Sequence, residues 1–143
     1  SFIFAGKIYD DIRDEFYQKC RNLQDKVQIL CFDEFCEYSF LGSLCLSSDF
    51  ILLPYSNTSQ SSGVIGYASQ FQIPVVVAKQ GLLGKLVKRY KLGFLLEDTS
   101  VSSIKKFLIN TKNYNYRLGI SANYYQQRTI TLFNSIIFKQ FNV

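Results

Sequence analysis

The stretch LLPYSNTSQSSGVIGYASQFQIPVVVAKQGLLG, from Leu52 to Gly84, carries most of the information about the fold. It passes from an apolar run into a polar segment, then into a Gly-containing helical pattern, a second apolar run and a second Gly-rich turn. The runs 50–54 and 74–78 are apolar at consecutive positions, as expected of parallel strands covered on both faces. A polar loop and a crossover helix are therefore predicted between two buried strands.

The same alternation continues on both sides of this stretch. Apolar runs predict strands at 2–5, 27–32, 50–54, 74–78 and 93–96. Residues with helical spacing predict helices over 12–23, 35–46, 63–71 and 82–90. Because parallel strands joined by helices need right-handed crossovers, the pattern predicts a doubly wound, Rossmann-like α/β sheet.

After Asp98 the strand pattern stops. Thr99 or Ser100 is expected to cap a helix that contains Val101 and Ile104, and 116–141 predicts one or two more helices. We expect a Rossmann-like domain over 1–112 and C-terminal helices over 113–143 that pack on it or on a neighbouring domain. The chain starts with Ser-Phe-Ile-Phe and shows no leader, so we expect it to be part of a longer protein.

Charge is unevenly distributed along the chain. Residues 1–78 carry five Lys/Arg against nine Asp/Glu, and residues 79–143 carry eleven against two. The basic half is expected either to be a solvated surface or to attract phosphate groups, nucleic acid or an anionic membrane surface. A nucleic-acid partner is disfavoured, because the Phe residues fall mostly at core spacings and no RNA-binding or helix-turn-helix signature occurs.

Four cysteines, Cys20, Cys31, Cys36 and Cys45, lie among apolar neighbours, and the chain has no histidine. Only one cysteine pair approaches metal-ligand spacing, so buried free thiols are favoured over a zinc site. We expect no metal and no cofactor, and a reducing, cytoplasmic compartment. No apolar run approaches the roughly 20 residues that a membrane-spanning helix requires.

The polar loop before 63–71 leaves the carboxyl end of a predicted strand, where open parallel sheets bind ligands. The first turn of the next helix contains Ser61, Ser62, Gly63 and Val64. Its unpaired N–H groups and its partial positive charge suit a phosphate, and a glycine lets the ligand approach the backbone. The alternative is that the serines only cap the helix.

The order of motifs resembles the donor-binding C-terminal domain of the retaining glycosyltransferases with two Rossmann-like domains, known as the group 1 family with the GT-B fold. The resemblance covers about 2–108 and rests on five segments in order. They are Leu52-Leu53-Pro54-Tyr55, Gln60-Ser61-Ser62-Gly63-Val64, Gln72-Ile73-Pro74-Val75-Val76-Val77-Ala78, Gly81-Leu82-Leu83-Gly84-Lys85-Leu86-Val87 and Gly93-Phe94-Leu95-Leu96-Glu97-Asp98.

This resemblance implies that Ser61, Ser62, Gly63 and Val64 face the diphosphate and sugar of a nucleoside diphosphate sugar. The turn Gln80, Gly81 and Leu82 would lie beside the same pocket, and Phe32 and Asp33 would border the base. Two glutamates of the family correspond to Ser59 and Tyr67, so either the Tyr67 hydroxyl replaces a carboxylate at the ribose or this contact is missing.

The family's Arg and Lys that clamp the diphosphate belong to a strand-helix unit expected upstream of Phe2, with Lys7 as a nearby charge. An acceptor-binding domain is expected further upstream. The implied reaction is retaining transfer of a sugar to a hydroxyl of a glycan, polysaccharide or lipid-linked acceptor, with peripheral contact at the inner face of the membrane. No catalytic residue can be assigned. The alternative is a non-catalytic, Rossmann-like module that binds a nucleotide or docks a partner.

Overall fold

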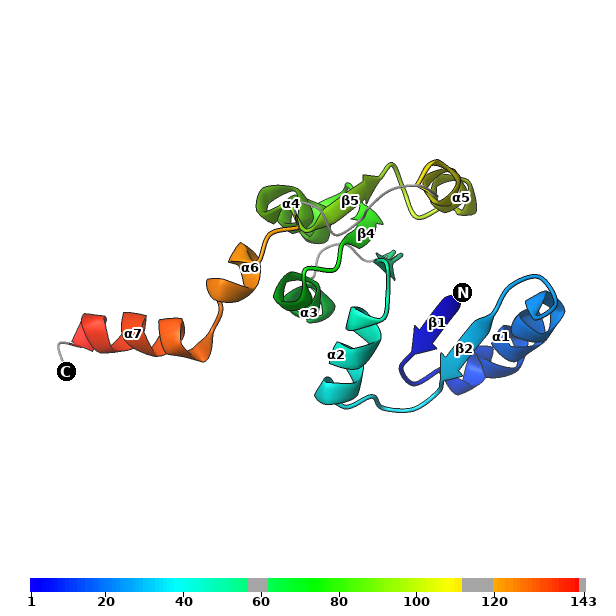
Figure 1. Cartoon of the computed structure of the whole chain (residues 1–143), viewed down its shortest axis with the longest axis horizontal. Helices are drawn as coiled ribbons and strands as arrows, with labels where there is room; N and C mark the ends of the chain where they lie inside the picture. The colour runs from blue at the N-terminus through cyan, green and yellow to red at the C-terminus, as the bar shows by residue number, and fades with distance from the viewer. Residues whose placement is uncertain (57–61, 112–119, 142–143) are drawn as a thin grey trace. The chain divides into compact units, whose positions relative to one another are not determined.

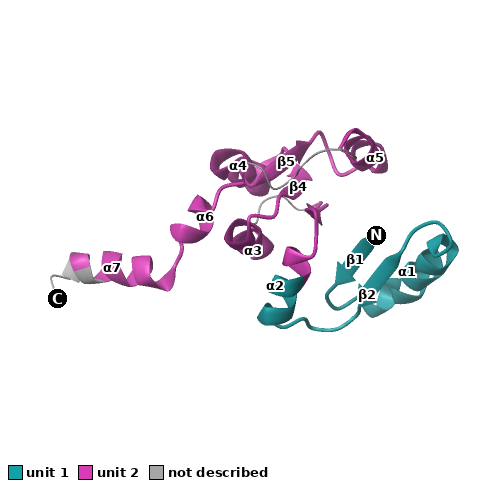
Figure 2. Cartoon of the chain, in the orientation of Figure 1, with its two compact units in different colours: residues 1–43 teal, residues 44–143 magenta. Residues whose placement is uncertain are grey.

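A computed structural model describes residues 1–56, 62–111 and 120–141 (Figure 1). The chain forms two compact units, unit 1 over Ser1–Ser43 and unit 2 over Leu44–Val143 (Figure 2). The division falls within the helix α2 (Tyr38–Leu46). Each unit has its own parallel sheet.

Unit 1 is built on two parallel strands, β1 (Phe2–Ala5) and β2 (Ile29–Phe32), connected through the helix α1 (Asp10–Leu23). The rings of Phe4 and Phe16 meet edge to face with centroids 5.0 Å apart, which places α1 on one face of the strand pair. No residue of α1 is fully buried. Unit 1 therefore has a thin apolar core.

Unit 2 contains three parallel strands in the order β3 (Ile51–Leu53), β4 (Val75–Ala78) and β5 (Gly93–Leu96). Every residue of β4 is buried, as the sequence predicted for a strand covered on both faces. The core cluster joins Val75 and Val77 of this strand to residues of the helices α3 (Val64–Phe71) and α4 (Gly81–Tyr90).

The opposite face of this sheet is covered by the helix α5 (Val101–Asn110). Phe94 pairs with Val76 in the ladder, so its side chain lies on the face away from Val75 and Val77. The ring of Phe107, from α5, contacts the ring of Phe94 with centroids 5.2 Å apart. Unit 2 is therefore a parallel sheet with helices on both faces.

The two helices that lead into β4 and β5 end in the same way. Gln72 follows α3 and Lys91 follows α4, and both have left-handed backbone angles (φ 55° and 53°). The next residues, Ile73 and Leu92, are fully buried, and their N–H groups donate back to Ala68 and Val87 at 2.9 and 3.0 Å. This pattern of reversed bonds with a buried apolar residue is the Schellman motif.

A short helix, α6 (Asn123–Gln126), packs against α3 through Ser69, a fully buried polar residue. The Ser69 hydroxyl donates to the Ser121 carbonyl oxygen and accepts the Tyr125 N–H, both at 3.0 Å. Tyr124 enters the core of the unit, where its ring meets Tyr90 edge to face. The Ser69 hydroxyl thus binds one residue before α6 and one residue within it, and so holds α6 against α3.

The last described helix is α7 (Ile130–Phe141), whose apolar side chains at 130, 132, 133, 136 and 137 are exposed. Within the described ranges, no helix is both long enough and apolar enough to span a bilayer.

The predicted α/β class, the alternation of strands and helices, and the parallel pairing are confirmed. The ladders of the described strands form a two-stranded and a three-stranded parallel sheet, an arrangement compatible with a Rossmann-like fold. The boundary expected between a domain over 1–112 and C-terminal helices over 113–143 remains a prediction.

Candidate functional site

Three helices of unit 2 follow the carboxyl ends of its three strands. Since β3, β4 and β5 are parallel, their carboxyl ends lie on one edge of the sheet, and α3, α4 and α5 come next in the chain. This edge is where open α/β sheets bind ligands. We refer to the residues 54–56, 62–64, 79–82 and 97–100 as the carboxyl edge.

At the start of α3, Ser62 acts as the capping residue. Its hydroxyl accepts the Val64 N–H at 3.2 Å, and its carbonyl oxygen accepts the Ile65 N–H at 3.2 Å. The same hydroxyl lies 3.3 Å from the Tyr55 hydroxyl. The Val64 N–H, one of the donors expected to bind a phosphate, thus already donates to the Ser62 hydroxyl.

Gly63 is the most accessible backbone at this helix start. It is exposed, and a Cβ built on it would meet nothing within 4 Å. Its φ of −57° is an ordinary helical angle, so this position does not require glycine for conformational reasons. A side chain at this position would therefore meet no steric obstacle in the fold, and its absence leaves the backbone open to solvent.

The second turn on the edge is the start of α4. Gly81 has φ 73°, a left-handed angle that favours glycine, and the adjacent Leu82 is 41% exposed. Gly84, one turn further along, touches the end of β4, since a Cβ there would lie 2.4 Å from the Lys79 carbonyl oxygen. The helix start is therefore held directly against the strand end.

Three residues connect the ends of β4 and β5, and the sequence had indicated neither Lys79 as part of the site nor its pairing with Glu97. The Lys79 ammonium is ion-paired with the Glu97 carboxylate, and Gln80 Nε2 donates to the Glu97 carbonyl oxygen at 2.6 Å. The register that pairs Ala78 with Leu96 explains the contact, since Lys79 and Glu97 each follow one of these residues. The sequence signal for this contact is a pair of oppositely charged residues, each of which directly follows one of two neighbouring strands.

The start of α5 contains a carboxylate held by hydroxyls. Asp98 Oδ1 accepts the Ser100 hydroxyl at 2.5 Å and the Ser100 N–H at 2.9 Å. Bonds from the Ser100 and Ser103 side chains and the Ser100 N–H lower the pKa of Asp98 to about 2. Ser100 also accepts the Ser103 N–H, so of the two expected caps Ser100 fills the role.

The remaining predicted residues have different placements. Ser61 lies outside the described residues, as does Ser59. Tyr67 is half-buried, one turn into α3 from Gly63, and engages in an interaction with another group. The structure thus places Ser62, Gly63, Val64, Gly81 and Leu82 at helix starts on the carboxyl edge.

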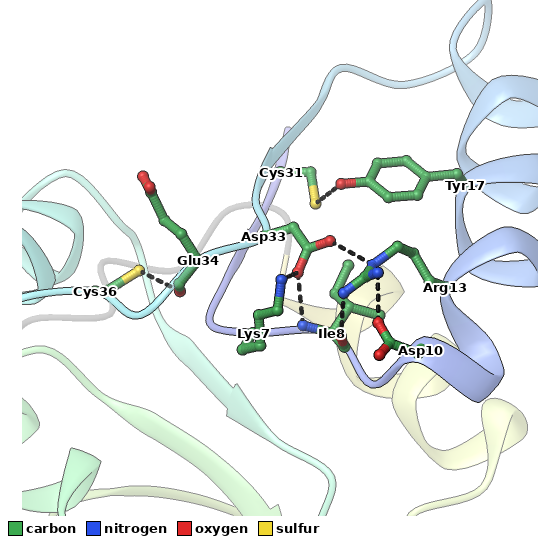
Figure 3. A network of polar contacts seen from close by, with 9 residues as sticks. All are labelled: Lys7, Ile8, Asp10, Arg13, Tyr17, Cys31, Asp33, Glu34 and Cys36. Atoms are coloured by element: carbon green, nitrogen blue, oxygen red, sulfur yellow. Dashed lines mark hydrogen bonds and ion pairs between the residues drawn. The ribbon is translucent and has the colours of Figure 1, made fainter.

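Lys7 lies in unit 1, just past β1, in a network centred on Asp33 (Figure 3). Asp33 accepts the Ile8 N–H at 2.8 Å and Arg13 Nε at 2.9 Å, while Lys7 Nζ is 3.6 Å away. The Ile8 bond is the largest cause of a lowered Asp33 pKa, and Arg13 and Lys7 add to it against the opposing effect of burial. Arg13 also bonds the Ile8 carbonyl oxygen at 3.0 Å and Asp10 at 2.5 Å.

This network gives Asp33 a structural role. Both of its carboxylate oxygens are bonded, and its side chain is only 14% exposed. The end of β2 is thereby fastened to the start of α1, whereas the family resemblance implied only that Asp33 borders the base. The Lys7 side chain is 64% exposed and remains accessible to solvent.

All four cysteines are free thiols, with Cys36 and Cys45 buried and Cys20 and Cys31 partly buried. Burial raises the pKa of Cys45. The Cys31 thiol donates to the Tyr17 hydroxyl at 3.7 Å (Figure 3). A search over the described residues finds no group of three Cys, Asp or Glu side chains placed to hold a metal ion.

Comparison with known proteins gives no match to a family model, to a curated protein or to a solved structure.

Proposed function

We propose that this chain is the donor-binding part of a retaining glycosyltransferase that moves a sugar from a nucleoside diphosphate sugar to a hydroxyl acceptor. The observation that carries the proposal is the carboxyl edge of unit 2, with its accessible Gly63 at the start of α3 and Gly81 at the start of α4. Helix starts of this kind stabilise anionic groups through N–H groups and a partial positive charge.

The strand ladders give independent support. A doubly wound sheet of two mononucleotide-binding halves has the order 3-2-1-4-5-6. When strand 1 is removed from this order, strands 3 and 2 remain neighbours, and strands 4, 5 and 6 remain a second set of neighbours. The ladders β1-β2 and β3-β4-β5 have these two patterns. The proposal therefore includes a further strand-helix unit upstream of Phe2, as the family resemblance implies.

The proposed chemistry follows from the departing diphosphate. When the bond from the anomeric carbon to the diphosphate breaks, negative charge grows on the phosphate oxygens, and preorganised N–H groups stabilise it without reorganisation. Gly63 and the α4 start would supply part of this stabilisation. The upstream unit would add basic side chains, and an acceptor-binding domain would bring the hydroxyl to the sugar.

Three features favour the alternative of a non-catalytic nucleotide-binding or partner-docking module. Lys79, a cation on the carboxyl edge, is already neutralised by Glu97, and the Ser62 hydroxyl already serves the helix. Neither Ser59 nor Tyr67 is acidic. Such an edge would bind a nucleotide but stabilise a leaving diphosphate weakly.

Replacing Gly63 by Val tests the proposed site. The added side chain enters open space at an ordinary helical φ, so the fold should persist, while the approach of a phosphate to the backbone is blocked. In NMR titrations with UDP, GDP and ADP, the wild-type chain should bind one nucleotide with a Kd of roughly 0.1–1 mM. The Gly63→Val protein should bind it at least about tenfold more weakly.

Gly66→Val is the matched control, because Gly66 lies on the same helix and also faces open space. It should leave nucleotide binding unchanged. Identical titrations of wild-type and Gly63→Val would refute the site. In an assay for sugar transfer the chain alone should transfer nothing, because proximity of both substrates contributes up to roughly 7–11 kcal/mol in well-oriented systems and this chain supplies only the donor side. Turnover by this chain alone would contradict the proposed half-site.

A further inference from the structure

The helix α7 exposes a continuous apolar surface. Ile130 is 72% exposed, Phe133 60% and Ile136 49%, and Leu132 and Ile137 are each 36% exposed. At 100° per residue these five positions fall within one arc of the helix, while Thr131 and Ser135 lie on the opposite arc. We call the five side chains the apolar arc.

A group of unpaired cations lies at the end of α4. Lys88, Arg89 and Lys91 are exposed there, and the Arg89 guanidinium lies 5.5 Å from the centroid of the Tyr90 ring. The Arg128 guanidinium lies 5.3 Å from the same centroid. No ion pair found among the described residues involves these four side chains, which we call the basic cluster.

One member of the basic cluster, Arg128, is adjacent in the chain to the helix that carries the apolar arc. The position of Arg128 is fixed by its stacking 3.9 Å over the Tyr124 ring. Only Thr129 separates Arg128 from α7, and Thr129 already belongs to the helix start, since its carbonyl oxygen accepts the Phe133 N–H at 3.0 Å and its hydroxyl the Leu132 N–H at 3.3 Å. The amphipathic helix α7 thus begins directly after Arg128.

We propose that unit 2 docks on an anionic lipid bilayer, with the apolar arc inserted at the headgroup boundary and the basic cluster bound to lipid phosphates. Charge complementarity selects this partner, because four exposed cations lack carboxylate partners and one of them, Arg128, directly precedes the apolar helix. Nucleic acid would use the cations but leave Ile130 and Phe133 in water. A single apolar element binds a membrane only marginally, whereas an apolar element combined with a basic patch gives stable, reversible docking.

The proposal goes beyond the proposed function and stands on different residues. The experiment is co-sedimentation of the full chain with vesicles of phosphatidylcholine alone and of phosphatidylcholine mixed with phosphatidylglycerol. Binding is expected only with phosphatidylglycerol, and it should weaken at high salt. Replacing Lys88, Arg89 and Lys91 by Gln should weaken the partition about fivefold for each charge removed.

Two matched variants test the apolar arc. Phe133→Asp with Ile137→Asp should abolish binding, whereas Thr131→Asp with Ser135→Asp, the same charge change on the opposite arc, should reduce it far less. Arg21→Gln, Lys19→Gln and Lys26→Gln together remove three charges from unit 1 and should have little effect. Nucleotide titration of each variant reports on the carboxyl edge separately.

Three results would overturn the proposal. Equal binding to neutral and anionic vesicles would show that the basic cluster has no part in docking. Absence of binding to both vesicles would exclude a bilayer partner. The third result is self-association of the chain without vesicle binding. If Phe133→Asp with Ile137→Asp abolished this self-association, the apolar arc would be assigned to a second copy of the chain.

Discussion

Two helical glycines, Gly66 in α3 and Gly84 in α4, have opposite surroundings. A Cβ at Gly66 would meet nothing within 4 Å, whereas at Gly84 it would lie 2.4 Å from the Lys79 carbonyl oxygen and 2.7 Å from that of Ala78. Both contacts at Gly84 are with backbone at the end of β4, which cannot rotate away as a side chain can. At residue scale, this close approach fixes α4 against the carboxyl edge.

Alanine substitutions at these two glycines should therefore change the free energy of unfolding in opposite directions. Gly66→Ala should raise the free energy of unfolding by about 0.5–1 kcal/mol, because alanine favours the helix more than glycine does. Gly84→Ala should lower it by about 1–3 kcal/mol, since the overpacking cost exceeds the same helical gain. Urea denaturation of both variants measures the difference, and stabilisation by Gly84→Ala would contradict the geometry.

A second residue-scale prediction concerns Asp98. Its pKa, about 2, lies below the ordinary value of 3.8, so the carboxylate stabilises the folded chain above about pH 4 and this contribution is lost as the pH falls towards 2. Ser100→Ala should raise the Asp98 pKa towards its ordinary value, because it removes the first cause of the shift. Carboxyl-detected NMR titration measures this, with Ser43→Ala, at an exposed serine outside this cluster, as the control. An unchanged midpoint in Ser100→Ala would contradict the assignment.

At the scale of elements, the connection between α3 and α6 depends on one hydroxyl. Ser69→Ala leaves the Ser121 carbonyl oxygen and the Tyr125 N–H without their bonds in a partly buried place. The free energy of unfolding should fall by about 1–3 kcal/mol. Gln70→Ala, at an exposed neighbouring position, should change it by less than about 0.5 kcal/mol. Equal effects of the two substitutions would show that the hydroxyl does not hold α6.

The elements themselves were largely predictable from local patterns. The run Val75–Ala78 indicated a buried strand because no position in it is polar, and β4 is fully buried. Ser69 could not be predicted to be buried, since its partners Ser121 and Tyr125 are more than fifty residues away in sequence. The same limit applies to the candidate site: Ser62 and Gly63 were identifiable from their place after a strand, but the Lys79 pair with Glu97 depends on strand register.

At the scale of the whole molecule, burial is concentrated in unit 2. The fully buried large side chains, among them Ile65, Ile73 and Leu92, all belong to it, whereas α1 in unit 1 buries none. Regions with few buried apolar contacts open at lower free energy than the core. Unit 1 should therefore open without unfolding of unit 2.

Native-state hydrogen exchange tests this expectation. The β4 amides should exchange only through global unfolding, whereas those of β1 and β2 should exchange through a smaller opening with weaker dependence on denaturant. The amides of Val77 and Phe4 are suitable reporters, because each lies inside a ladder. Identical exchange free energies for both would show that the chain unfolds as a single cooperative body.

Among the five described strands, only β4 has a strand neighbour on both sides. The other four strands, FIFA, ILCF, ILL and GFLL, contain neither a charged residue nor a proline. Natural proteins usually protect such edges with lysine, proline or a bulge, because an unprotected edge is a template for assembly between molecules. Concentrated solutions of this chain should accordingly form cross-β aggregates detectable by thioflavin fluorescence, and a lysine placed in β1 or β3 should delay their formation.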